Sequence, residues 1–211
     1  MRAEYLQDRI SRGLGAAARH IGLPYDAHRP SGPSTPLAAS NRYLRLSAAF
    51  NVEDPRFQRP SGYARATWFA ILDSAYTRPG DYLVGPNATF FIAAQQSLLP
   101  ILCVQTNRTV TISRPAAPGA LGINTYGGTT LATALPLLTA WPASILASGG
   151  GSAGDLPGDS RLPWWSILLP TAPATLRPAD LIHDDLGRTH IIASAELTDL
   201  GWRLTAKQAA T

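Results

Sequence analysis

The sequence has 211 residues, of which only 15% are charged, and it contains 18 glycines and 18 prolines. This composition excludes a protein built from long charged helices and favours short strands joined by tight turns. Cys103 is the only cysteine, which excludes an intramolecular disulfide. No apolar run approaches the ~20 residues of a membrane-spanning helix, and we expect no secretory signal at the polar N-terminus.

The net charge of +4 is not spread evenly along the chain, because residues 1–66 contain ten arginines but only five acidic residues. A basic segment can contact nucleic acid, yet these arginines are not clustered and no aromatic residues alternate with them to stack on bases. We therefore expect an acidic protein surface as the partner. The candidate interface residues are Arg2, Arg9, Arg12, Arg19 and Arg29.

Residues 1–41 are expected to form a helix followed by an extended arm. Apolar residues recur at helical spacing between residues 3 and 20, which predicts one short amphipathic helix. The segment from Pro24 to Ala39 is rich in proline, which excludes a helix or a central strand. The arm is therefore expected to be disordered or to order against a neighbouring subunit.

Residues 42–115 are expected to form a first β domain of short strands. The turn-rich tetrapeptide Gly85–Ala88 predicts a hairpin between the apolar segments on either side of it. Ile101–Val104 and Thr109–Ser113 are expected to pair as a second hairpin around Asn107.

Residues 116–136 are rich in glycine, proline and threonine and are expected to form a linker to a second β domain at residues 137–211. The second domain also contains a hairpin turn, Asp184–Gly187. The predicted fold class is all-β, with two related small β-barrel or sandwich units in tandem after a short N-terminal helix and an extended proline-rich arm.

Two segments roughly 100 residues apart carry the same motifs in the same order, and this period fits one small β domain used twice. The first segment contains WFAIL, RPGDYL, TFFIAAQ and ILCV, and the second contains WWSIL, RPADLI, THIIASAE and GWRL. The alignment predicts a repeated core that includes Trp68 with Trp164 and Ile92 with Ile192. It also pairs Arg78 with Arg177, Asp81 with Asp180 and Thr89 with Thr189.

The repeated aspartates Asp81 and Asp180 are expected to accept backbone N–H bonds in a turn, because reappearance in both copies points to a requirement of the fold. The repeated arginines Arg78 and Arg177 point to a requirement of the fold in the same way, since each could pair with a carboxylate of its own domain. Neither pair is expected to be catalytic.

The most enzyme-like cluster in the sequence is His183, Asp184, Asp185 and His190, because imidazole and carboxylate groups together can hold a divalent metal. One alternative function is therefore a metal-dependent hydrolase that uses these four residues. However, Asp184 and Asp185 lie in a hairpin turn, where aspartate is common for backbone reasons, and the equivalent turn at Gly85 has no ligand. We expect no metal, no cofactor and no catalytic residue.

A second alternative is a carbohydrate-binding or receptor-binding module built on tryptophan side chains. Trp68, Trp164, Trp165 and Trp202 could form a sugar platform if they were exposed. Their position at the starts of strands favours packing in a core instead.

The segment from Gly80 to Pro115, GDYLVG…TFFIAAQQSLLPILCVQTNRTVTISRP, resembles segments of virion proteins of tailed bacteriophages that infect Gram-negative bacteria. The short basic helix and the proline-rich arm before it are similar too. The plan of two β units resembles the head-completion, stopper, adaptor and tail-nozzle proteins that form rings under the portal. The resemblance covers roughly residues 1–115, and the doubled β unit departs from it.

The resemblance implies a non-enzymatic subunit of a homo-oligomeric ring in the neck or tail of the phage. Such a ring would contact the portal or adjacent neck and tail proteins, and DNA would pass through its lumen without specific binding. The expected location is the virion, after assembly in the host cytoplasm, with no contact to a membrane.

Overall fold

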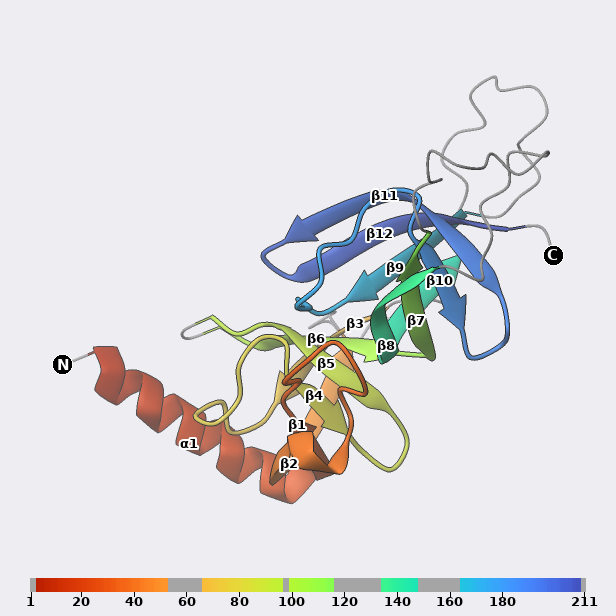
Figure 1. Ribbon diagram of the computed structural model, residues 1–211. Coiled ribbons are helices and arrows are strands. Elements are labelled where there is room, and N and C mark those ends of the chain that lie inside the picture. The colour runs from red at the N-terminus through yellow and green to blue at the C-terminus, as the bar shows by residue number, and fades with distance from the viewer. Residues whose placement is uncertain (1–2, 53–65, 97–98, 116–133, 148–163, 210–211) are drawn as a thin grey trace, which may run out of the picture.

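The computed structural model describes residues 3–52, 66–96, 99–115, 134–147 and 164–209 (Figure 1). These residues form one α-helix, α1 (Ala3–Ile21), a 3-10 turn, η1 (Ala39–Asn41), and two closed β-barrels that follow each other along the chain. The predicted all-β fold class with two tandem barrel units is confirmed. No helix among the described residues has the length and hydropathy needed to cross a membrane.

The first barrel contains six strands in the order β1-β2-β3-β6-β5-β4, with β4 next to β1. All neighbouring strands are antiparallel. The strands are β1 (Leu23–His28), β2 (Arg42–Val52), β3 (Thr67–Ile71), β4 (Tyr82–Val84), β5 (Thr89–Ala94) and β6 (Ile101–Thr106).

The second barrel repeats this topology, with the order β7-β8-β9-β12-β11-β10. Each strand of the first barrel therefore has a counterpart six strands later in the chain. The strands are β7 (Arg108–Arg114), β8 (Leu135–Ala147), β9 (Trp164–Leu169), β10 (Leu181–Asp184), β11 (Thr189–Thr198) and β12 (Gly201–Gln208).

The barrels divide the chain differently from the domains predicted at 1–41, 42–115 and 137–211. β1 lies within the predicted arm but is a strand of the first barrel, and β7 lies within the predicted first domain but belongs to the second barrel. The hairpin expected between β6 and β7 is therefore absent. Asn107 separates these strands, and its side chain binds both backbone groups of Ile145 in β8 at 2.8 and 2.9 Å.

The proline-rich segment after β1 lies against the second barrel of the same chain. The carbonyl of Pro33 accepts hydrogen bonds from Trp141 Nε1 at 2.7 Å and from the backbone N–H of Thr139 at 3.0 Å. Thr35 donates its own N–H to the carbonyl of Thr139 at 2.8 Å. Proline removes backbone donors but leaves carbonyl acceptors, so this segment orders within the chain and needs no neighbouring subunit.

The ladder register corrects one residue pair of the sequence repeat. Trp68 and Ile92 both lie opposite Cys103, whereas Trp165 and Ile192 both lie opposite Ala206. The counterpart of Trp68 is therefore Trp165 rather than Trp164. Adjacent strand residues point to opposite faces, so a slip of one residue exchanges an inward side chain for an outward one.

Burial of the four predicted core residues agrees with this register. Ile92 and Ile192 are 0% and 1% exposed. Trp68 and Trp165 each pack against the buried cluster of their own barrel, whereas Trp164 lies under the Nζ atom of Lys207, 4.6 Å from its ring centroid. The motif GWRL is also not the structural counterpart of ILCV. Cys103 of ILCV corresponds to Ala206, which comes after GWRL in the chain.

The two barrels pack directly against each other. Tyr82 in β4 is fully buried, donates its hydroxyl to the carbonyl of Pro142 at 2.8 Å, and packs edge to face on Trp141 with 6.2 Å between ring centroids. Phe91 in β5 is 1% exposed and belongs to the same buried cluster. One apolar cluster therefore extends from the outer face of the first barrel into the core of the second.

Candidate functional site

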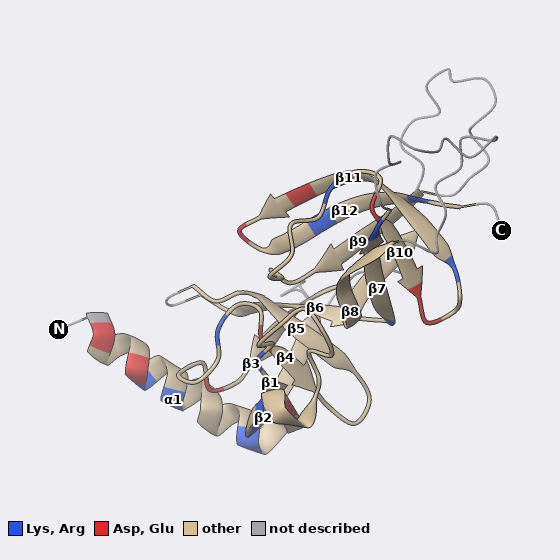
Figure 2. Ribbon diagram, in the orientation of Figure 1, with Lys and Arg blue, Asp and Glu red and all other residues tan. Residues whose placement is uncertain are grey.

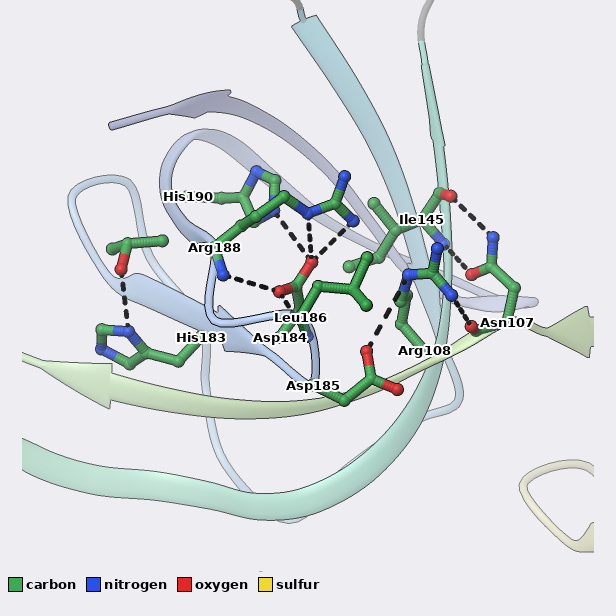
Figure 3. A network of polar contacts seen from close by, with 10 residues as sticks. Asn107, Arg108, Ile145, His183, Asp184, Asp185, Leu186, Arg188 and His190 are labelled. Carbon is green, nitrogen blue, oxygen red and sulfur yellow. Dashed lines mark hydrogen bonds and ion pairs between the residues drawn. The ribbon is translucent and has the colours of Figure 1, made fainter. Parts of the chain in front are cut away.

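The hairpin turn between β10 and β11 holds the buried carboxylate of Asp184 in a network within the chain (Figure 3). Its Oδ1 atom accepts the backbone N–H groups of Leu186 and Arg188, and its Oδ2 atom binds the Arg188 guanidinium at 2.7 Å. Burial alone would raise the pKa of Asp184, but the hydrogen bonds from Arg188 and Leu186 outweigh it and lower that pKa. The carboxylate is thus ionised, and both of its oxygens accept hydrogen bonds from residues of the turn.

His190 is fully buried beside this carboxylate, with its Nε2 atom 3.5 Å from Asp184 Oδ2. Neither ring nitrogen has a hydrogen-bond partner within the described part of the chain. Burial lowers the pKa of His190 more than the Asp184 carboxylate raises it, so the imidazole is neutral near pH 7. A neutral imidazole in this place acts chiefly as an aromatic core residue.

The first barrel explains why an aromatic ring stands at this position. His190 is the counterpart of Phe90, since Phe90 and Ile92 correspond to His190 and Ile192 in the strand register. Phe90 packs edge to face on Trp68 with 6.1 Å between centroids, and His190 packs on Trp165 in the same manner with 5.6 Å between centroids. The imidazole therefore takes over a packing role that a phenyl ring fills in the first copy.

The other two residues of the expected metal cluster point elsewhere (Figure 3). His183 lies one strand position from Ile182, which pairs with His190, and its Nδ1 atom is 3.1 Å from Thr189 Oγ1. Asp185 is 45% exposed and lies 3.8 Å from Arg108. Within the described ranges, no group of three or more His, Cys, Asp or Glu residues is placed to hold a metal ion. The four residues do not converge on one point.

A second polar arrangement recurs in both barrels. Arg29 binds the carboxylate of Asp81 through two hydrogen bonds of 2.8 Å, and the hydroxyl of Tyr43 donates to the same carboxylate at 2.7 Å. Arg114 binds Asp180 in the same bidentate way at 2.8 and 2.9 Å. Both aspartates are buried, with exposures of 1% and 2%. Each ion pair ties the end of the first strand of its barrel to the turn before the fourth.

The same aspartates organise the Arg-Pro-x-Asp turn. The backbone N–H of Arg78 donates to Asp81 Oδ2 at 3.0 Å, and that of Arg177 donates to Asp180 Oδ2 at 2.8 Å. The Arg78 side chain is 63% exposed and forms a long ion pair with Asp81 at 4.0 Å, so Arg29 and Arg114 are the closer partners of the two aspartates. The aspartates accept backbone bonds in a turn, as their repetition predicted.

The sequence contains a signal for the arginines that do form the pairs. Arg29 precedes Pro30, and Arg114 precedes Pro115, so an Arg-Pro dipeptide follows the first strand in each barrel. These dipeptides lie outside the duplicated motifs, which begin at Trp68 and Trp164. They are 85 residues apart rather than about 100, so the spacing of the other motifs does not align them.

The arginines proposed for a partner interface have different environments. Arg9 lies 5.8 Å from the Tyr5 ring centroid, Arg12 pairs with Asp8 at 3.3 Å, and Arg19 is exposed in the last turn of α1. Arg29 forms an ion pair with Asp81 inside the first barrel, so its charge is already neutralised within the chain. Arg2 lies outside the described residues.

The tryptophans do not gather into one exposed platform. Trp202 is 5% exposed, and Trp68 and Trp165 pack against their barrel cores. Trp164 alone of the four candidates lies outside the buried clusters formed by the described residues, under Lys207. A sugar-binding face would need exposed rings, and none of these four tryptophans is fully exposed.

The described surface includes a polar depression and a more apolar one. A polar one of about 360 Å³ lies between α1 and the first barrel and is lined in part by Gln7, Ser74 and Gln95. A more apolar one of about 450 Å³ lies on the second barrel beside Arg114, Leu181 and Ile191. Comparison of the chain with protein-family models, curated proteins and solved structures gives no match to any of them.

Proposed function

We propose that this chain is a non-enzymatic structural subunit that forms a ring in the neck or tail of a tailed bacteriophage. Two features support a role in assembly rather than chemistry. The polar groups with catalytic potential, Asp184, Arg188 and His190, are used inside one barrel. The helix α1 carries an apolar surface that the described barrels bury only in part, and this observation carries the proposal.

Small side chains of α1 make close contacts with the first barrel. Ser11 Oγ lies 2.7 Å from Ser74 Oγ in a buried contact. A Cβ atom on Gly15 would lie 2.9 Å from Asp73 Cβ, so a larger residue there would push the helix outward. Ala18 is fully buried on the same side of the helix. Gly15 lowers helix propensity, and it is retained where close approach requires it.

The large apolar residues of α1 lie beside this buried side of the helix, with Ile10 and Leu14 partly buried. At about 100° per residue, they form a stripe that spans less than a third of a turn and lies next to the side of Ser11 and Ala18, with Leu14 one turn from each of them. Leu6 is 40% exposed and Ile21 is 64% exposed, and Ala17 between them is also exposed. We call this the α1 stripe, and its residues are Leu6, Ile10, Leu14, Ala17 and Ile21.

An amphipathic helix usually buries its apolar stripe, and an uncovered one indicates a surface for another protein. The described arginines also favour protein contacts over nucleic acid. Arg29, Arg114 and Arg188 are paired with buried carboxylates. Figure 2 shows the charged residues dispersed over both barrels rather than collected in one basic track. DNA would then pass through the ring without specific binding.

The proposal includes the portal or an adjacent neck or tail protein as partner, and the virion, assembled in the host cytoplasm, as location. Its test is the mass of the purified full chain, measured by native mass spectrometry and electron microscopy with and without portal protein. We expect a discrete oligomer or a portal complex. A chain that stays monomeric at all concentrations and binds no virion protein would refute the proposal.

A matched pair of variants makes this test specific. Leu6→Glu combined with Ile21→Glu should abolish the oligomer while the circular dichroism of the barrels is unchanged. Tyr5→Glu is the control, because Tyr5 is 56% exposed on the same helix but lies outside the α1 stripe. Equal effects of both changes would contradict the role of the stripe.

A further inference from the structure

The two barrels present equivalent outer faces directly after their buried aspartates. In the first barrel Tyr82 pairs with Phe91 across β4 and β5. In the second barrel Leu181 pairs with Ile191 across β10 and β11. Tyr82 follows Asp81 as Leu181 follows Asp180, so the two cross-strand pairs occupy the same position of the shared topology.

This face of the first barrel is covered within the chain. Tyr82 and Phe91 are 0% and 1% exposed because the second barrel lies on them, with Trp141 against the Tyr82 ring. The hydroxyl of Tyr82 is satisfied by the carbonyl of Pro142. The first barrel thus uses the β4–β5 face as a protein interface.

The equivalent face of the second barrel has no cover among the described residues. Ile191 is 42% exposed, Ala193 is exposed, and Leu181 is partly exposed. The depression of about 450 Å³ lies here, with the Arg177 side chain at its rim. We call this surface the β10–β11 face, with Leu181, Ile191 and Ala193 as its apolar residues.

Among the described residues, the α1 stripe and the β10–β11 face are apolar surfaces that the chain does not fully cover, and they belong to different barrels. The α1 stripe is carried by the first barrel, and the β10–β11 face is on the second (Figure 1). The N-terminal end of α1 points away from the second barrel (Figure 1). Two different surfaces on one subunit are what a heterologous, head-to-tail contact requires, and such contacts close into rings when the rotation permits.

We infer that the β10–β11 face of one subunit binds the α1 stripe of a second copy of this chain. Two observations support this occupant: the same face of the first barrel is already an interface, and the α1 stripe exposes Leu6, Ala17 and Ile21 on the first barrel's side of the subunit. The inference rests on the proposed function, because it names the two surfaces that would join neighbouring subunits of the ring.

Two half-blocked subunits test this pairing. One carries Leu6→Glu and Ile21→Glu and keeps an intact β10–β11 face. The other carries Ile191→Glu and Ala193→Glu and keeps an intact α1 stripe. Each alone should be monomeric by native mass spectrometry. An equimolar mixture should give a one-to-one dimer and nothing larger, because each dimer retains one complete pair of surfaces.

Leu197→Glu is the control on the same strand, since Leu197 is 54% exposed on β11 but lies outside the β10–β11 face. It should leave the oligomer of the unmodified chain intact. A mixture that stays monomeric while the unmodified chain oligomerises would overturn the inference and leave the proposed function standing. A dimer formed by the Ile191/Ala193 variant alone would indicate contact between two α1 stripes and would also overturn it.

A cross-linking experiment does not depend on how the charged variants fold. Cys103 is fully buried, so introduced thiols do not compete with it. Leu6→Cys in one copy and Ile191→Cys in another should form an intermolecular disulfide under mild oxidation, whereas Leu6→Cys with Leu197→Cys should form much less. Equal yields in both mixtures would refute the pairing. A monomeric unmodified chain with no cross-link would overturn both the inference and the proposed function.

Discussion

Arg29 donates two hydrogen bonds of 2.8 Å to the carboxylate of Asp81, and Asp81 is 1% exposed. The second barrel repeats this pair as Arg114 and Asp180. In each barrel the pair joins the end of the first strand to the turn before the fourth, so it connects the two strands where the barrel closes. A buried carboxylate that loses its cation is costly, and the duplicated pair allows that cost to be compared in two settings.

We predict that Arg114→Ala lowers the free energy of unfolding by roughly 3 kcal/mol, because it leaves Asp180 buried without a cation. Arg29→Ala should cost less, since the Tyr43 hydroxyl still donates to Asp81 at 2.7 Å. Denaturant unfolding measures both. Arg177→Ala is the control, because the Arg177 side chain is exposed, and it should change stability by less than about 0.5 kcal/mol. A larger loss for Arg177→Ala than for Arg114→Ala would contradict the assignment.

Gly80 and Ala179 occupy the same place in the two Arg-Pro-x-Asp turns, and both have left-handed backbone, with φ of 93° and 73°. Glycine adopts this conformation freely, whereas alanine is strained in it. We predict that Ala179→Gly raises the free energy of unfolding by about 0.5–1 kcal/mol and that Gly80→Ala lowers it by about 1 kcal/mol. A Cβ atom on Gly80 meets nothing within 4 Å, so a loss of stability in Gly80→Ala would come from backbone strain and not from a clash. Thermal unfolding measures this loss. Opposite signs would refute it.

Truncation separates the helix from the barrel. Removing residues 1–22 deletes α1 but keeps β1, so the first barrel should stay closed and the protein should stay folded. Removing residues 1–41 also deletes β1, which pairs with both β2 and β4, and should unfold the first barrel. Circular dichroism and thermal unfolding check both forms. A cooperative transition near that of the full chain after the longer deletion would show that β1 is dispensable.

Local patterns in the sequence predict turns well and predict which strands become neighbours poorly. The turn-rich segments Gly85–Ala88 and Asp184–Gly187 do join paired strands, because their residues favour tight turns whatever surrounds them. Asn107 stands between two strands in the same way, yet those strands enter different barrels. Whether these two strands pair with each other depends on the contact between Asn107 and Ile145, which lie far apart in sequence.

The same limit explains the register error at Trp164 and Trp165. Two adjacent tryptophans satisfy a sequence alignment equally well, and only the ladder to Ala206 determines which one faces the core. Strand geometry also explains why the residues of the candidate metal cluster do not come together. His183 and His190 are close in sequence, but His183 pairs with Thr189 and the paired partner of His190 is Ile182, so alternation separates the two imidazoles.

His190 should make stability depend on pH. Burial lowers its folded-state pKa, while in the unfolded chain it titrates near its ordinary value of about 6.5. Between these two values the unfolded chain binds more protons, so stability falls as the pH is lowered from 7 toward 5. His190→Phe, which copies Phe90 of the first barrel, should reduce this fall in melting temperature.

His183→Gln is the matched substitution in the pH experiment, because it replaces a histidine of the same hairpin whose Nδ1 atom contacts Thr189 Oγ1, and the His190→Phe result is compared with it. The Asp184 carboxylate contributes outside this window. Its lowered pKa means that its stabilising effect is present above its ordinary pKa of about 4 and is lost at lower pH. An unchanged slope in His190→Phe would show that another group carries the pH dependence.

The adjacent tryptophans of β9 give the sharpest test of the register. Trp165 packs on the core of the second barrel beside His190, with the Arg188 guanidinium 4.9 Å from its ring centroid, so Trp165→Ala should lower the free energy of unfolding by roughly 2–4 kcal/mol. Trp164 makes an outward contact with Lys207, which contributes at most about 1 kcal/mol at such a site. Denaturant unfolding of both variants should therefore differ clearly, and Trp68→Ala should behave like Trp165→Ala. If Trp164→Ala were instead the more damaging change, β9 would be shifted by one residue, and with it the equivalence of the two barrels on which the pairing of Leu181 with Ile191 depends.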